Sequence, residues 1–196
     1  MKKIVIFYII VVIVIFSGCS NKTKSELTVE EVLGPETTIV WNPYWWYEPE
    51  PCSIPKFFDG YVSEPQITEY GFYYSYVDVD QNGERDLALI SENCPIQFIV
   101  IKRDGTYYGI GLSVREGETF FTNGYILGDA GGGAETYYKI RVEGNKIVRD
   151  NIAMRTDDYP FKYFLNGKEV DEQEYETWIK ENCKEEVIFE HYDMNN

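Results

Sequence analysis

Histidine and basic residues are scarce in this 196-residue chain. The one histidine, His191, lies near the last residue, where chain ends usually fray, so a serine or cysteine triad has little support. Lysine and arginine number 18 against 33 aspartate and glutamate residues, which gives a formal net charge of −15. Such a surface repels phosphate backbones and excludes nucleic acid as a partner. It attracts cations and basic partners, or simply keeps the protein soluble.

A phosphate-binding loop is also missing. The segment Gly128–Ala134 is rich in glycine, but no Gly-Lys-Ser/Thr follows it, and Glu135–Ile140 has the pattern of a strand. One enzyme class stays open, a hydrolase that uses a pair of carboxylates, although 33 acidic residues cannot be sorted into a pair by sequence. A non-enzymatic role is therefore favoured.

Long hydrophobic runs are confined to the first residues. The run Ile4–Phe16 has 13 residues and would reach only ~20 Å as a helix, less than the ~30 Å core of a bilayer. With two lysines before it and Ser17-Gly18 after it, it has the three regions of a secretory signal peptide. The segment Phe16–Cys19 resembles the bacterial lipobox, in which the cysteine is lipidated and the signal is cut before it, although Phe16 stands where leucine is usual. An ordinary signal peptide or a short uncleaved anchor is the alternative.

This interpretation divides the chain into three parts. Residues 1–18 are expected to be a lipoprotein signal peptide, and residues 19–26 to be the lipidated Cys19 with a flexible polar tether. Residues 27–196 are expected to form a single globular domain, because the 178 residues left after cleavage have the size of one ordinary domain. Loss of two lysines with the signal takes the net charge to −17. We expect an extracytoplasmic protein that a lipid anchors to the membrane, on the bacterial cell surface or the periplasmic face.

Cysteine is sparse, with four residues in the chain. If Cys19 carries lipid, three remain, and an odd number cannot all pair. Cys52 and Cys94 each lie next to a proline in loop-like sequence, which favours a disulfide between them in a compartment that permits one. Cys183 falls on the apolar stripe of a predicted helix, where a free thiol behaves as a small hydrophobe. Three reduced thiols are the alternative, because sequence alone does not fix the pairing.

Aromatic residues, in contrast, make up 16% of the chain and cluster in short runs typical of strands. Tight-turn pairs separate these runs, because a two-residue hairpin turn needs positive φ angles that Asn-Gly and Asp-Gly tolerate. The predicted turns are Asp104-Gly105, Asn123-Gly124, Gly144-Asn145 and Asn166-Gly167. The pattern predicts an α+β fold that is mostly β, with an antiparallel meander sheet or a partly open barrel.

Helical patterns are few. Asp171 and Glu174 form a capping-box-like start, and Tyr175 and Trp178 follow on one face, which predicts a C-terminal helix packed on the sheet. Thr28–Leu33 is predicted to form a short helix that ends at a Gly-Pro pair.

An acidic loop between two predicted strands is the clearest local signal. Asp78, Asp80 and Asn82 occupy positions 1, 3 and 5 of a calcium loop. The remaining matches are Gly83 at position 6, the backbone carbonyl of Glu84 at 7, and Asp86 at 9. Position 12 is a leucine rather than glutamate and strand-like sequence follows, so a helix–loop–helix is excluded. The spacing predicts a structural calcium ion, and a solvated turn capped by aspartates is the alternative.

The loop also carries a resemblance. The pattern Tyr-x-x-x-Asp-hydrophobic-Asp-x-Asn-Gly-x-x-Asp-Leu, which begins at Tyr74, is similar to the strand–loop–strand element of many uncharacterised secreted proteins and lipoproteins of Gram-positive bacteria. It is also similar to the calcium loops of FG-GAP-type repeats. The later segment Asn166–Val170, with the acidic helix after it, resembles the end of such proteins. The resemblance covers two short segments and implies calcium and a cell-surface location, without an activity.

Tryptophan is concentrated in one stretch, which holds Trp41, Trp45 and Trp46. Exposed rings there would form a stacking platform for a cell-wall glycan, whereas burial under the neighbouring proline-rich segment would make them part of the core. The sequence as a whole predicts a non-enzymatic surface lipoprotein with one calcium loop and an unidentified extracellular partner. A glycan-binding module and a hydrolase are the alternatives.

Overall fold

The computed structural model describes residues 27–42, 50–61, 71–91, 96–113, 117, 119–131 and 133–193. The predicted signal peptide, Cys19 and the tether lie outside the described residues, as do Trp45, Trp46 and Cys94. None of the described helices is both long and apolar enough to cross a membrane.

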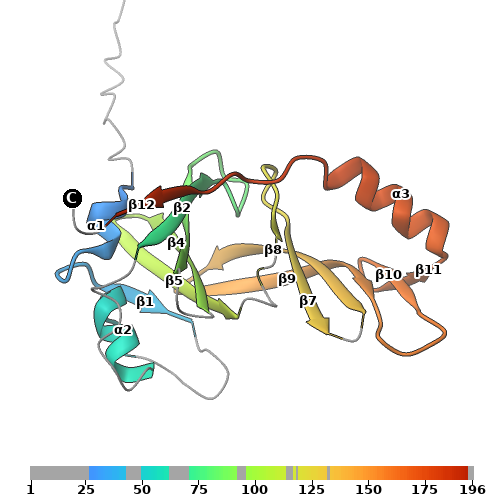
Figure 1. The fold of residues 1–196 in the computed structure, drawn as a ribbon, viewed down its shortest axis with the longest axis horizontal. Coiled ribbons are helices and arrows are strands. Elements are labelled where there is room, and N and C mark those ends of the chain that lie inside the picture. The colour runs from blue at the N-terminus through green and yellow to red at the C-terminus, as the bar shows by residue number, and fades with distance from the viewer. Residues whose placement is uncertain are drawn as a thin grey trace, which may run out of the picture.

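A six-stranded sheet follows the first helix (Figure 1). Its order is β1-β5-β4-β3-β2-β12. The strands are β1 (Ile39–Trp41), β2 (Phe72–Val77), β3 (Asp86–Ser91), β4 (Ile96–Arg103), β5 (Thr106–Ser113) and β12 (Glu190–Tyr192). Strands β2 to β5 form an antiparallel meander, as predicted. The edges differ from that pattern, because β1 pairs with β5 in parallel and β12 returns from the C-terminal segment to pair with β2.

The second six-stranded sheet is a meander throughout, in the order β11-β10-β9-β8-β7-β6. Its strands are β6 (Thr119–Phe120), β7 (Ile126–Gly131), β8 (Ala134–Glu143), β9 (Lys146–Arg155), β10 (Tyr163–Leu165) and β11 (Lys168–Val170). The β10–β11 turn has φ angles of 49° at Asn166 and 77° at Gly167, as the hairpin prediction requires. The predicted class is confirmed as mostly β, and the described strands form two open sheets rather than a closed barrel.

Three helices complete the described structure: α1 (Val29–Leu33), α2 (Ile54–Tyr61) and α3 (Glu172–Asn182). Both predicted helices form with side-chain caps, since Thr28 accepts from the Glu31 amide and Asp171 from the Glu174 amide. The helix α2 was not predicted, because its sequence lies among prolines. Its second residue is Pro55, which the first turn of a helix tolerates since the N–H there has no partner within the helix.

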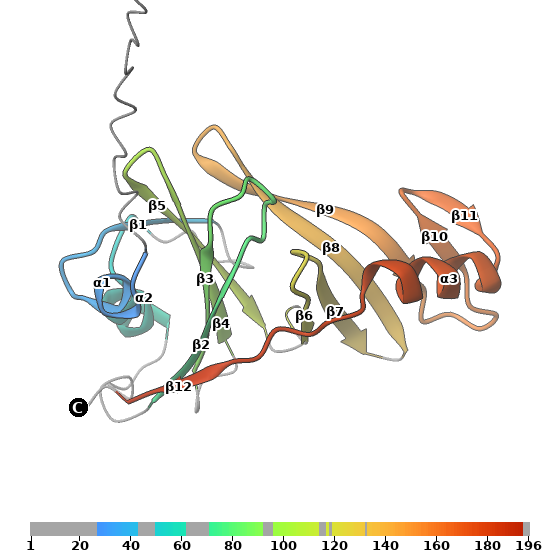
Figure 2. The same ribbon diagram turned by 90° about the horizontal axis from the view of Figure 1, so that it is seen from above.

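The core follows from side-chain alternation along the central strands. In β3, Leu87 and Leu89 pack with the residues of α1 and α2, whereas Ala88 packs toward the second sheet. The far face of the second sheet is covered by α3, whose Tyr175 is 1% exposed against Tyr137 of β8. The layers are therefore helices α1 and α2, the first sheet, the second sheet and α3, an order that Figure 2 shows from one end to the other.

Candidate functional site

The predicted calcium loop connects β2 to β3, and its own side chains hold its backbone. The Asp78 carboxylate accepts hydrogen bonds from the amides of Asn82 (3.0 Å) and Gly83 (2.8 Å). The Asn82 side chain in turn accepts from the Glu84 amide at 2.6 Å. Gly83 has a φ of +84°, in the left-handed region that favours glycine. The loop therefore closes with oxygen-bearing side chains turned inward.

The second sheet supports this loop from outside. Val79 is fully buried in the core between the two sheets, which fixes the loop at its middle. Gln81 donates a hydrogen bond to the carbonyl of Asn123 at 2.6 Å, in the turn between β6 and β7. A Cβ added to Gly124 in that turn would lie 2.6 Å from the carbonyl oxygen of Asp78, so the two turns pack closely enough to need glycine there.

Asp86 begins β3 and is the most buried acid of the loop, with 0% of its surface exposed. One carboxylate oxygen accepts from the Val79 amide at 3.1 Å, and the other lies 3.3 Å from Nη2 of Arg103. Burial raises the pKa of Asp86 to about 7, and the positive charge of Arg103 only partly offsets this rise.

Arg103 is the residue at this site that the loop sequence does not reveal. It ends β4, and its guanidinium lies 2.5 Å from Asp80, 3.3 Å from Asp86 and 3.7 Å from Glu84. Its side chain is 19% exposed. Only the strand register could have indicated that Arg103 belongs to this site. Leu87 of β3 pairs with Val100 of β4, and this pairing places the end of β4 alongside the loop.

Three carboxylates of the loop converge on one point. Ligand oxygens of Asp78, Asp80 and Asp86 all lie within 4.8 Å of one another. The Asp80 side chain is 8% exposed, and its Oδ1 atom is buried with no hydrogen-bond partner. Such a buried oxygen is costly unless a donor or a cation meets it. An all-oxygen donor set of this kind fits a hard cation such as calcium.

The other two predicted ligands lie differently. Asn82 directs its side-chain oxygen to the Glu84 amide, and the Glu84 carboxylate faces Arg103. Leu89, at position 12 of the loop, is fully buried in the core. The structure thus brings the carboxylates of Asp78, Asp80 and Asp86 together and adds Arg103 beside them, whereas Asn82 and the Glu84 carbonyl stay predicted ligands.

Of the three tryptophans considered as a possible glycan platform, only Trp41 lies among the described residues. It is 6% exposed, its Nε1 donates to the carbonyl of Cys52 at 3.0 Å, and its ring packs against Phe57 at 4.5 Å. A Cβ at Gly109, its partner on β5, would lie 2.6 Å from the Trp41 ring. Trp41 is therefore a core residue and offers no free ring face to a sugar, which agrees with burial, the favoured alternative, and corrects its place in the possible glycan platform.

Two of the cysteines that were considered for a disulfide also lie among the described residues. Among the described residues, Cys52 is a buried free thiol and Cys183 is a half-buried one beside α3. Burial raises the pKa of both thiols, that of Cys183 to about 11. Cys52 therefore carries no disulfide in this structure, which does not show the predicted bridge to Cys94, and Cys94 itself lies outside the described residues.

His191 does not lie in a frayed tail. It is the middle residue of β12, opposite Tyr73 of β2, and the two rings lie 5.2 Å apart. The sequence misses this strand because it is only three residues long and pairs with a strand more than 100 residues earlier.

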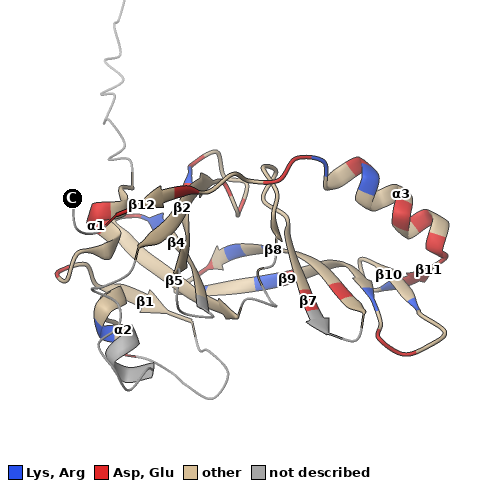
Figure 3. Ribbon diagram, in the orientation of Figure 1, with Lys and Arg blue, Asp and Glu red and all other residues tan. Residues whose placement is uncertain are grey.

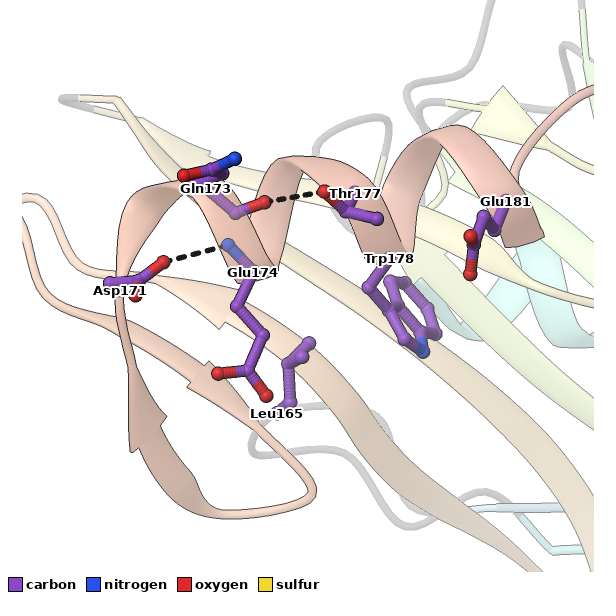
Figure 4. Close-up of a pocket in the computed structure, with 7 residues that line it drawn as sticks. All are labelled: Leu165, Asp171, Gln173, Glu174, Thr177, Trp178 and Glu181. Atoms are coloured by element: carbon purple, nitrogen blue, oxygen red, sulfur yellow. Dashed lines mark hydrogen bonds between the residues drawn. The ribbon is translucent and has the colours of Figure 1, made fainter.

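A shallow groove of about 450 Å³ runs along α3 (Figure 4). Its walls include Asp171, Glu174 and Glu181, and Leu165 and Trp178 line it with apolar surface. Asp171 is engaged as the helix cap, and Trp178 packs against Tyr125 and Tyr137 beneath the helix. Acidic residues outnumber basic ones along α3, as the red stretches of the helix in Figure 3 show. Capping and packing thus account for Asp171 and Trp178.

Comparison of this chain with known protein families, with curated proteins and with solved structures finds no match.

Proposed function

We propose that this chain is a lipid-anchored, extracytoplasmic protein whose domain is a non-enzymatic binding module with one structural calcium ion in the loop 78–86. The observation that carries the calcium assignment is the convergence of Asp78, Asp80 and Asp86 on one point together with the buried, unpartnered Oδ1 of Asp80. These three aspartates would hold the ion. The ion would supply positive charge to a loop that otherwise buries acidic oxygens at a cost.

The loop supports a structural role better than a sensor role. Asp78 and Asn82 already fold its backbone, and Val79 anchors it in the core. Position 12 offers the buried side chain of Leu89 instead of a bidentate glutamate. Binding should therefore fall in the weak extracellular range, with a dissociation constant on the order of 0.1 to 1 mM.

Calorimetric titration of the purified protein tests the calcium assignment. One calcium ion per chain should bind in the range above, and Asp80→Ala should abolish binding because it removes a ligand oxygen. Asp150→Ala is the matched control, since Asp150 is an exposed acid paired with Arg141 on the second sheet and should leave the isotherm unchanged. Equal binding by wild type and Asp80→Ala would refute the site.

The anchor rests on the Ser17-Gly18-Cys19 sequence. The first described residue, Leu27, is buried with the residues of α1, and α1 lies at the opposite end of the molecule from α3 (Figure 1). Cys19→Ala should abolish incorporation of labelled fatty acid and leave an unprocessed precursor. Normal cleavage of that variant by an ordinary signal peptidase would contradict the lipoprotein assignment.

A further inference from the structure

Arg103 is held firmly among the acids of the loop. Its Nη1 donates to the carbonyl of Lys102 at 2.6 Å, which orients the guanidinium. Its Nη2 is shared between Oδ2 of Asp80 and Oδ1 of Asp86. Arg103 thus contacts two of the three carboxylates that converge in the loop, whereas the oxygens of Asp78 accept from backbone amides.

The single positive charge of the guanidinium does not neutralise all the carboxylates around it. It contacts three carboxylates, those of Asp80, Glu84 and Asp86, and supplies one positive charge to them. It meets Oδ2 of Asp80, while Oδ1 of the same carboxylate stays buried without a partner. The cluster therefore combines an internal cation with an oxygen that a second cation would satisfy.

We infer that Arg103 is an internal counter-cation that competes with calcium for Asp80 and Asp86, and so sets the weak affinity of the loop. This inference rests on the calcium site proposed above. In the absence of calcium, Arg103 holds the acids together and keeps the loop folded. When calcium binds, for instance at the free Oδ1 of Asp80, its double positive charge repels the guanidinium across the shared carboxylates and drives it from at least one of the two aspartates.

The size of the effect follows from Coulomb's law. A single positive charge about 5 Å from a divalent ion weakens its binding by roughly tenfold even with the screening of bulk water, and by more in a partly buried site. Replacing Arg103 by a neutral residue should therefore strengthen calcium binding at least about tenfold. The same change should weaken the calcium-free fold, since the acids then repel one another without an internal cation.

Calorimetric titration of purified wild-type protein, Arg103→Gln and Arg141→Gln with calcium tests this inference. Arg141 of β8 is the matched control, because it is an arginine between two carboxylates that lie outside the loop, Glu143 at 2.9 Å and Asp150 at 2.8 Å. Arg103→Gln should bind calcium at least about tenfold more tightly than wild type, and Arg141→Gln should match wild type. A gain in both variants would indicate only a general effect of net charge and would overturn the inference.

The other outcomes separate this inference from the proposed function. If wild type and Arg103→Gln bind with the same constant, Arg103 is no competitor while the calcium site stands. If only Arg103→Gln binds, the competition is correct and the native loop is not a calcium site. If neither binds, both ideas are wrong.

A measurement on the wild-type protein covers the case in which Arg103→Gln does not fold. Hydrogen exchange of the Arg103 guanidinium, followed by NMR, should become faster when calcium is added, because the group loses an aspartate partner. Unchanged or slower exchange in protein saturated with calcium would contradict the inference.

Discussion

Asp86 shows how one buried carboxyl ties the stability of this domain to pH. Its pKa rises from 3.8 to about 7 in the folded protein, chiefly because of burial. Between about pH 4 and pH 7 the folded state therefore holds a proton that the unfolded state has released. The contribution of Asp86 to the free energy of unfolding is complete below this window and is lost as the pH rises through it.

The corresponding prediction concerns Asp86→Asn, which has nearly the same shape and does not titrate. From pH 5 to pH 8 in the presence of a chelator, the wild type should lose about 2 to 3 kcal/mol more stability than the variant. Urea unfolding at unit pH intervals measures this difference. Parallel pH profiles for the two proteins would show that the carboxyl ionises as freely in the folded state as in the unfolded one.

At the residue level, the sequence predicts the acids of the loop but not the cation beside them. The spacing of Asp78, Asp80 and Asp86 is local, so it can be read within nine residues. Arg103 comes from the next strand pair, and only the register of β3 and β4 brings it to the loop. The burial of Trp41 is equally non-local, because it depends on the parallel pairing of β1 with β5.

Helices and strands could also be predicted where local sequence determines them, and not where pairing with a distant segment does. Four hairpins could be predicted, β4–β5, β6–β7, β8–β9 and β10–β11, because each turn pairs a glycine with asparagine or aspartate. Both turn residues have positive φ in β4–β5 and β10–β11, and the glycine alone has it in β6–β7 and β8–β9. The two edge strands β1 and β12 could not, since each has three residues and pairs with a strand distant in sequence. The helix α2 escaped prediction because proline-rich sequence hides its apolar face, which packs Phe57 into the core.

Across the whole molecule, the loop lies where the two sheets meet. Val79 packs in the core between the sheets, and Gln81 reaches the β6–β7 turn. Arg103 approaches from the first sheet. A cation in the loop would therefore stabilise the junction of both sheets, which the sequence could not indicate because it does not place one sheet on the other.

Thermal unfolding of the whole protein with calcium, with magnesium and with chelator tests the central claim most directly. At about 1 mM free calcium, a dissociation constant of 0.1 to 1 mM gives roughly 0.4 to 1.4 kcal/mol of added stability, and hence a melting shift of a few degrees. Magnesium should give a smaller shift, because it demands stricter octahedral geometry and gives up its water reluctantly. Asp80→Ala should remove the calcium shift. Identical melting of the wild type under all three conditions would contradict the account and leave Asp78, Asp80 and Asp86 as an acidic turn neutralised by Arg103 alone.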